Sequence, residues 1–218
     1  MLGFGLTTVF SRPTLSYQRL NREDILSDEE LYNKIKRTIS DRLHFRVFES
    51  LMIFNKAVLK TNFYQPTKVA LSFRLSGNFL PPSEFPSHPY GIFLVVGSDF
   101  RGFHVRFKDV ARGGIRLIRS RNSEAFSINQ RNLFDENYSL ASTQASKNKD
   151  IPEGGAKGTI LPDLDAQPRT CFEKYIDSLL DLMLKGNTPG IKEDIVDLHK
   201  KPEILFLGPD EGEDNEPC

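Results

Sequence analysis

The 218-residue chain carries 29 basic and 29 acidic residues, so its formal net charge is zero, and 39% of its residues are hydrophobic. A chain of this length can bury one sizeable core, in one domain or two small ones. The neutral balance gives no electrostatic case for binding nucleic acid or an anionic membrane, and the longest apolar runs are far too short to span a bilayer. The two cysteines, Cys171 and Cys218, imply neither a disulfide framework nor a zinc site.

The N-terminal stretch contains Arg12 and Arg19, several hydroxyl side chains and no acid before Glu23. This composition is compatible with a mitochondrial transit peptide, and equally with the start of an ordinary domain. We therefore expect residues 1–26 to be a poorly defined segment and the protein to be mitochondrial or cytoplasmic.

Residues 27–62 have the pattern of a long helical segment. Ser27-Asp28-Glu29-Glu30 is a capping box, and apolar side chains follow at four-residue spacing from Leu31 to Leu43 and continue to Phe54. The pattern predicts one amphipathic helix that ends near Lys60.

The pattern then changes to the alternation typical of strands. Apolar and polar side chains alternate over residues 67–75 and 103–107, and residues 90–97 form an apolar run of the buried-strand kind. Four prolines in residues 77–89 exclude regular ladder bonds and predict a connection there. We expect three strands in this part of the chain.

The remaining elements complete an α/β pattern. Residues 119–137 are polar and either helical or irregular, and residues 157–161 read as a short strand. A helix is expected from Pro168, closed by Gly186, with a core stripe of Phe172, Ile176, Leu179, Leu180, Met183 and Leu184. Residues 203–207 are expected to form a final short strand.

Helices interleaved with strands predict an α/β fold with a mixed or largely parallel sheet flanked by helices. In such sheets, sites gather where strands end in glycine-rich loops. Residues 153–160 (EGGAKGTI) and 208–212 (GPDEG) are both expected to be loops of that kind.

Four local clusters are candidates for chemistry. One is the basic run Lys147-Asn148-Lys149, which as a charge run is by default a solvated surface. Arg112 and Arg116 flank a glycine pair and could clamp an anion, although a solvated basic turn has the same pattern. EGGAKGTI fails the phosphate-loop pattern, but a lysine on a tight turn can approach a ligand; alternatively the glycines serve only the turn. Asp210 is an acid at a predicted strand end, where aspartate also serves turns. Together they suit a doubly negative substrate.

At this point the chain resembles the large NAD-specific glutamate dehydrogenases of fungi and other microbial eukaryotes. The resemblance lies in FRGFHVRFKDVARGGIRLIRSRN (100–122), FDENYSLASTQASKNKDIPEGGAKGTI (134–160), EKYIDSLLDLML (173–184) and EILFLGPDEG (203–212), and VLKTNFYQPTKVALSFRL (58–75) extends it upstream. It covers roughly residues 45–212 in one colinear order.

The resemblance implies oxidative deamination of L-glutamate to 2-oxoglutarate and ammonia, with NAD as hydride acceptor, in a homo-oligomeric parent enzyme. It implies that Lys157 is the catalytic lysine and that Asp210 relays protons to and from the amino group. Substrate contacts fall on Gly154 and Gly155 of the lysine motif, on Arg112, which stands where smaller family members have lysine, and on Lys147 or alternatively Lys149.

The family also needs a Rossmann-type domain with a Gly-x-Gly-x-x-Gly loop, and this sequence contains no such loop. We therefore expect residues 63–212 to be the substrate domain without its cofactor half, followed by a disordered acidic tail at 213–218, and the isolated chain to be inactive. Three interpretations stay open: part of a glutamate dehydrogenase, a short dicarboxylate-binding or regulatory module, or a non-functional gene fragment.

Overall fold

The computed structural model describes residues 27–147, 153–189, 195–208 and 210. The chain divides into two compact units between Ala57 and Val58, five residues before the boundary expected from the sequence, and each unit is described by itself. The segments expected at 1–26 and 213–218 lie outside the described residues.

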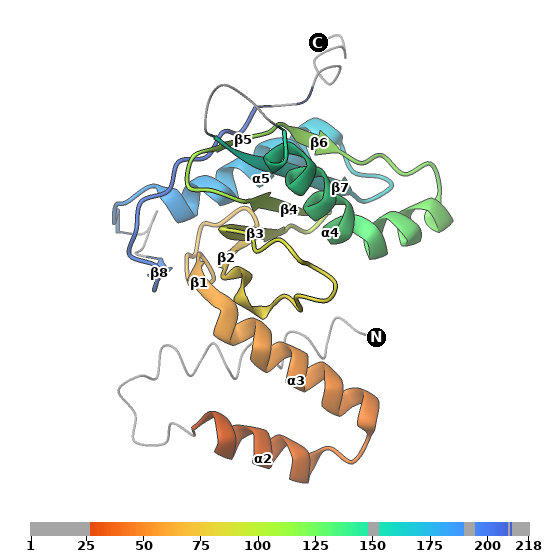
Figure 1. Ribbon diagram of the computed structural model, residues 1–218, viewed down its shortest axis with the longest axis vertical. Helices are drawn as coiled ribbons and strands as arrows, with labels where there is room; N and C mark the ends of the chain where they lie inside the picture. The colour runs from red at the N-terminus through yellow and green to blue at the C-terminus, as the bar shows by residue number, and fades with distance from the viewer. Residues whose placement is uncertain (1–26, 148–152, 190–194, 209, 211–218) are drawn as a thin grey trace. The chain divides into compact units, whose positions relative to one another are not determined.

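The first unit contains two helices, α2 (Asp28–Thr38) and α3 (Arg42–Ala57), drawn in orange in Figure 1. The capping box at Ser27 is present as predicted. The prediction of one continuous helix is wrong, because Asp41 starts a second helix by accepting a hydrogen bond from the backbone N–H of His44 at 2.8 Å. The α3 helix ends at Ala57, and the chain continues as a strand.

In the second unit, the described residues form one eight-stranded sheet. Its strands are β1 (Val58–Thr61), β2 (Leu71–Leu75), β3 (Gly91–Val96), β4 (Phe100–Arg106), β5 (Ala111–Arg112), β6 (Ile115–Leu117), β7 (Gly154–Pro162) and β8 (Val196–Asp197). The order is β5-β7-β4-β3-β2-β1-β8, and β6 also pairs with β7. The predicted α/β fold with a mixed sheet is confirmed: β5 and β6 run parallel to β7, whereas the other neighbours are antiparallel.

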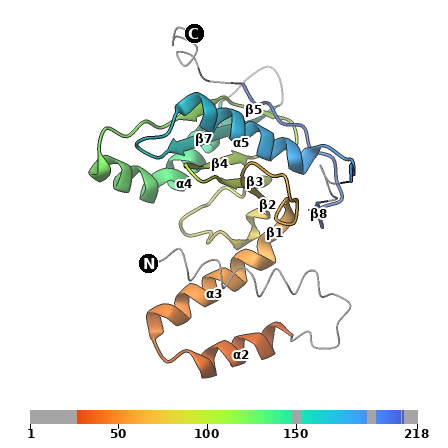
Figure 2. The ribbon, with the colours of Figure 1, turned by 180° about the vertical axis from the view of Figure 1, so that it is seen from behind.

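Two helices cover opposite faces of this sheet, as Figures 1 and 2 show from its two sides. The α5 helix (Pro168–Met183) packs on Phe93, Val95 and Ile160, whose side chains share one face because they lie on alternate strand positions. The α4 helix (Ser123–Ala145) packs on the other face, where Phe134 contacts Phe103 with ring centroids 5.1 Å apart. Lys157 belongs to the face under α4.

The helical elements of this unit agree with the sequence in type but not in detail. The stretch expected to be helical or irregular is α4, which starts at the N-cap Asn122. The predicted helix from Pro168 is confirmed, but its buried face is Cys171, Tyr175, Ser178, Leu179 and Leu182, whereas Leu184 is exposed. The proline-rich connection holds only the short 3-10 helix η1 (Gly77–Phe79).

Two expectations about the site segments are wrong. The glycine-rich stretch is not a loop, because Gly154 begins β7 and every residue of this nine-residue strand is buried. Residues 203–207 form no strand; Leu205 and Leu207 pack on the core while Ile204 and Phe206 are exposed. Their alternation therefore reflects one-sided burial and not ladder pairing. No helix in the described part of the chain is long and apolar enough to cross a membrane.

Candidate functional site

Lys157 and Asp210 form a direct ion pair between Nζ and Oδ2, although 53 positions separate them in the sequence. Lys157 lies in the middle of β7, opposite Val105 of β4, and only 6% of it is exposed. The Asp210 side chain is 26% exposed. The pair therefore joins a buried amine on the sheet to a carboxylate that is partly exposed to solvent.

Backbone hydrogen bonds fix Asp210 beside β6. The N–H of Ile115 donates to the carbonyl of Gly208 at 2.9 Å, and the N–H of Asp210 donates to the carbonyl of Ile115 at 3.0 Å. A side chain at Gly114 would collide with the Asp210 carboxylate. Gly114 therefore leaves the space in which this carboxylate lies.

The glycine at position 155 has a packing role. A Cβ atom there would overlap the backbone of α4 at Ala141 and Ala145. Because Gly155 has no side chain, the helix backbone lies directly on β7, two residues from Lys157. Gly155 therefore serves close approach of helix and strand, and not a tight turn.

The residues expected to contact substrate carboxylates are only partly brought together. Arg112 lies in β5 beside Gly155, but its side chain is exposed and its Nε is 2.6 Å from Oε1 of Glu153. Gly154 is buried at the start of β7. Lys147 is exposed just after the end of α4, and Lys149 lies outside the described residues. Their substrate roles stay predictions.

Sequence reasoning missed Asn137, which is fully buried on α4. Its Nδ2 donates to the carbonyl of Lys157 at 2.9 Å and to the hydroxyl of Thr159 at 3.0 Å. It also lies 3.3 Å from the carbonyl of Phe103. The Asn137 side chain therefore fixes α4 relative to β7. The sequence did not indicate this role, because Asn137 is one polar residue among many in its stretch.

Sequence reasoning also left Arg116 without a role beyond the anion clamp. It lies in β6, with Nε 3.9 Å from Oδ2 of Asp210 and Nη1 3.6 Å from Oε1 of Glu136 on α4. The candidate site is thus a chain of alternating charges, Glu136, Arg116, Asp210 and Lys157, supported by α4, β6 and β7.

A second charged cluster lies beside strands β1 and β2. Arg74 on β2 bonds Glu203 through Nη2 at 2.9 Å, and both side chains are almost fully buried. Lys60 of β1 lies 4.0 Å from the other oxygen of Glu203 and donates to the carbonyl of Lys201. Because each charge has an opposite partner, this cluster reads as structural.

His104 and Arg106 lie on β4, on the face opposite Lys157. Burial, reinforced by the charge of Arg106, lowers the pKa of His104 to about 3, so the imidazole is neutral near neutral pH. Arg106 donates to the backbone carbonyls of Lys108 and Asp109. Neither side chain reaches the Lys157 pair through a contact in the described structure.

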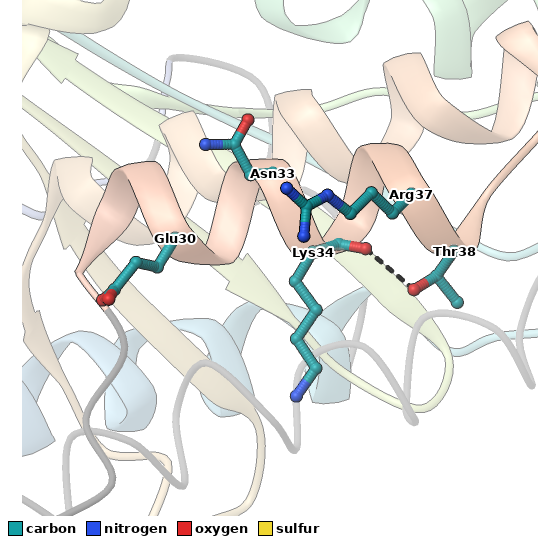
Figure 3. Close-up of a pocket in the computed structure, with 5 residues that line it drawn as sticks. All are labelled: Glu30, Asn33, Lys34, Arg37 and Thr38. Atoms are coloured by element: carbon teal, nitrogen blue, oxygen red, sulfur yellow. Dashed lines mark hydrogen bonds between the residues drawn. The ribbon is translucent and has the colours of Figure 1, made fainter.

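Two surface hollows are lined by residues other than the ion pair. One is lined by Glu30, Asn33, Lys34, Arg37 and Thr38, which all come from α2 (Figure 3). The other lies in the second unit beside Lys60 and Glu203. A shallow hollow on one helix offers no converging groups, and the described residues contain no group of three His, Cys, Asp or Glu side chains that could hold a metal.

Comparison with known proteins identifies the family of this chain. Residues 30–211 match the family described as the bacterial NAD-glutamate dehydrogenase catalytic domain. The NAD-specific glutamate dehydrogenase of Neurospora crassa is 62% identical over 190 residues, which is 86% of this chain and 18% of that protein. Glutamate dehydrogenase 2 of Dictyostelium discoideum is 54% identical over 87% of this chain, and the NAD-specific glutamate dehydrogenase of Saccharomyces cerevisiae is 49% identical over 91%.

This chain spans only 18 or 19% of the length of these relatives. The matched region nevertheless includes every residue of the Glu136–Arg116–Asp210–Lys157 arrangement. The chain belongs to the NAD-specific glutamate dehydrogenase family and matches its catalytic domain.

Proposed function

We propose that this chain is the substrate-side part of an NAD-dependent glutamate dehydrogenase, which converts L-glutamate to 2-oxoglutarate and ammonia. The observation that carries the proposal is the contact between Lys157 and Asp210, which joins the lysine of the GGAKG stretch to the acid of the GPD stretch. Family membership supports the reaction, because the relatives are named NAD-specific glutamate dehydrogenases.

Each of the two side chains has a role in this reaction. The Lys157 amine assists attack of water on the substrate imine and stabilises the carbinolamine that develops. The Asp210 carboxylate carries protons to and from the substrate nitrogen. Such a relay requires hydrogen-bond reach to the substrate nitrogen. The contact with Lys157 places the carboxylate beside the amine that acts on the same substrate carbon.

Anion recognition of the substrate is assigned to Arg112 and Lys147, with Lys149 as the alternative to Lys147. The guanidinium of Arg112 offers forked donors to a carboxylate. Its side chain is exposed and forms an ion pair with Glu153. We propose that the substrate side-chain carboxylate replaces Glu153 on Arg112. Gly154 and Gly155 keep the backbone of β7 close to the substrate.

NAD supplies the hydride acceptor when the parent enzyme binds it. This sequence contains no Gly-x-Gly-x-x-Gly loop for the pyrophosphate, so we assign no residue here to the cofactor. Because positioning of donor and acceptor supplies much of the rate, we expect the 218-residue chain to show no glutamate-dependent NADH production on its own.

Isothermal titration of the purified chain with 2-oxoglutarate and, separately, with NAD tests the binding part of the proposal. We expect 2-oxoglutarate to bind and NAD not to bind. Binding should be lost in Arg112→Ala and Lys147→Ala and retained in Arg169→Ala, an exposed arginine of α5 that serves as matched control. Absence of 2-oxoglutarate binding by a folded chain would contradict this assignment of the substrate site.

Turnover tests the catalytic part. In the longer protein that includes this chain and a cofactor domain, Lys157→Ala should lower kcat by at least about 100-fold. Circular dichroism should confirm that the variant is folded. Undiminished turnover in a folded Lys157→Ala protein would mean that this lysine is structural.

A further inference from the structure

Two cations compete for one oxygen of Asp210. Lys157 Nζ bonds Oδ2 directly, and Nε of Arg116 faces the same oxygen at 3.9 Å. This second distance is beyond a hydrogen bond, so Arg116 is close to the carboxylate without being bonded to it. Its other side lies 3.6 Å from Oε1 of Glu136.

In the direct ion pair, the Lys157 amine that the proposed reaction needs is bonded to Asp210. For Lys157 to engage the substrate imine, its amine must turn away from Asp210. That movement would leave a carboxylate with only 26% of its side chain exposed and no bonded cation. An unpaired, partly buried charge is costly, so the movement needs a second cation within reach.

Arg116 is placed to supply that cation. A guanidinium stays charged at all working pH values and offers several donors, so it can hold Glu136 with one and Asp210 with another. Its side chain is 47% exposed, so it has room to move. Closing a gap of about 1 Å gives an ordinary charge-assisted hydrogen bond.

The neighbouring elements fix the backbone of Arg116 close to Lys157. Arg116 pairs with Thr159 in the parallel register of β6 and β7, two residues from Lys157. Glu136 precedes Asn137, whose amide is bonded to the carbonyl of Lys157. The resting partner of Arg116 is therefore tied to the same strand as the lysine.

We propose that Arg116 is a positioning residue that takes over from Lys157 as counter-ion of Asp210 when the lysine turns to the substrate. Glu136 holds the guanidinium until then. This inference rests on the proposed glutamate dehydrogenase activity, but it makes a separate prediction about one side chain that the substrate itself need not touch.

Steady-state kinetics of the longer protein with its cofactor domain tests the handover. Arg116→Gln should lower kcat by about tenfold or more, with KM for glutamate changed by less than about twofold, because the interaction forms after substrate has bound. Arg116→Lys should recover part of the loss, since it restores the charge but not the fork. Arg169→Gln on α5 is the matched arginine control and should leave both constants unchanged.

A double-mutant cycle separates this role from general support of the fold. If Arg116 acts through Asp210, Arg116→Gln should cause little further loss in an Asp210→Asn background. An equal loss in both backgrounds would overturn the proposal. So would an Arg116→Gln enzyme with unchanged kcat, while the glutamate dehydrogenase activity itself would stand.

A second readout needs no turnover. In the 218-residue chain, the nitrogen NMR signal of Arg116 Nε should shift when 2-oxoglutarate is added, and this shift should disappear in Asp210→Asn. Lack of 2-oxoglutarate binding would refute both the substrate site and the handover. Binding that leaves the Arg116 signal unmoved would refute the handover alone.

Discussion

At the scale of the residue, His104 is a fully buried titratable group of the second unit. It is 1% exposed on β4, and neither ring nitrogen has a hydrogen-bond partner among the described residues. Phe93 lies beside it with ring centroids 6.2 Å apart. Burial lowers the pKa of His104 to about 3, with a smaller contribution from the charge of Arg106. The ring is therefore a neutral, packed aromatic group near neutral pH.

This shift predicts a pH dependence of stability. The unfolded state takes up a proton below about pH 6.5, whereas the folded state does not until about pH 3, so stability present above pH 6.5 is lost as pH falls through that window. Urea unfolding of the chain should show about 2 kcal/mol less loss between pH 7 and pH 5 in His104→Leu than in the original protein. His44→Leu, an exposed histidine of α3, is the control. Equal losses with and without His104 would contradict the prediction.

At the scale of the element, the approach of α4 to β7 depends on Gly155. Gly155→Ala would place a methyl group against the helix backbone at Ala141 and Ala145. We expect the free energy of unfolding to fall by about 1–3 kcal/mol, because overpacking forces helix and strand apart. Urea unfolding measures this, with Ser139→Ala on the exposed side of α4 as a neutral control. A Gly155→Ala chain as stable as the original would show that the helix can move at little cost.

The sequence predicts elements whose signals are local. The alternation of β2 and β4, the apolar run of β3 and the proline start of α5 all lie within a few residues, and each was recovered. Pairing between distant segments was not recoverable in this way. The glycine-rich start of β7 has the composition of a loop, yet it is a strand. Its glycines allow close packing, with Gly155 against α4 and Gly158 against Ile115 of β6. Lys157 and Asp210 were candidates from their local patterns, but their catalytic roles came from the family resemblance, and no spacing rule predicts contact between positions 53 apart.

At the scale of the second unit, the segment from Glu203 to Asp210 connects the two charged clusters. It runs along one side of the sheet from β8 towards β5, as the dark blue trace in Figure 1 shows. One end is fixed by the Arg74–Glu203 ion pair, and the other by the backbone bonds of Gly208 and Asp210 to Ile115. Leu205 and Leu207 pack on the core between them. The segment that carries the proposed proton carrier is therefore anchored at its other end by a buried ion pair to Arg74 of β2.

Glu203→Gln tests this anchoring. Removing the charge leaves Arg74 without its ion-pair partner in a nearly fully buried site, so stability should fall by about 3 kcal/mol. The released segment should also loosen at its far end. We therefore expect the amide of Asp210, bonded to the carbonyl of Ile115, to exchange its hydrogen at least about tenfold faster relative to the core strands. Glu173→Gln, in an exposed ion pair on α5, should change neither quantity measurably. If Glu203→Gln lowered stability but left exchange at Asp210 in step with the core, the two ends of the segment would be held independently, and the ion pair would support the fold without supporting the site.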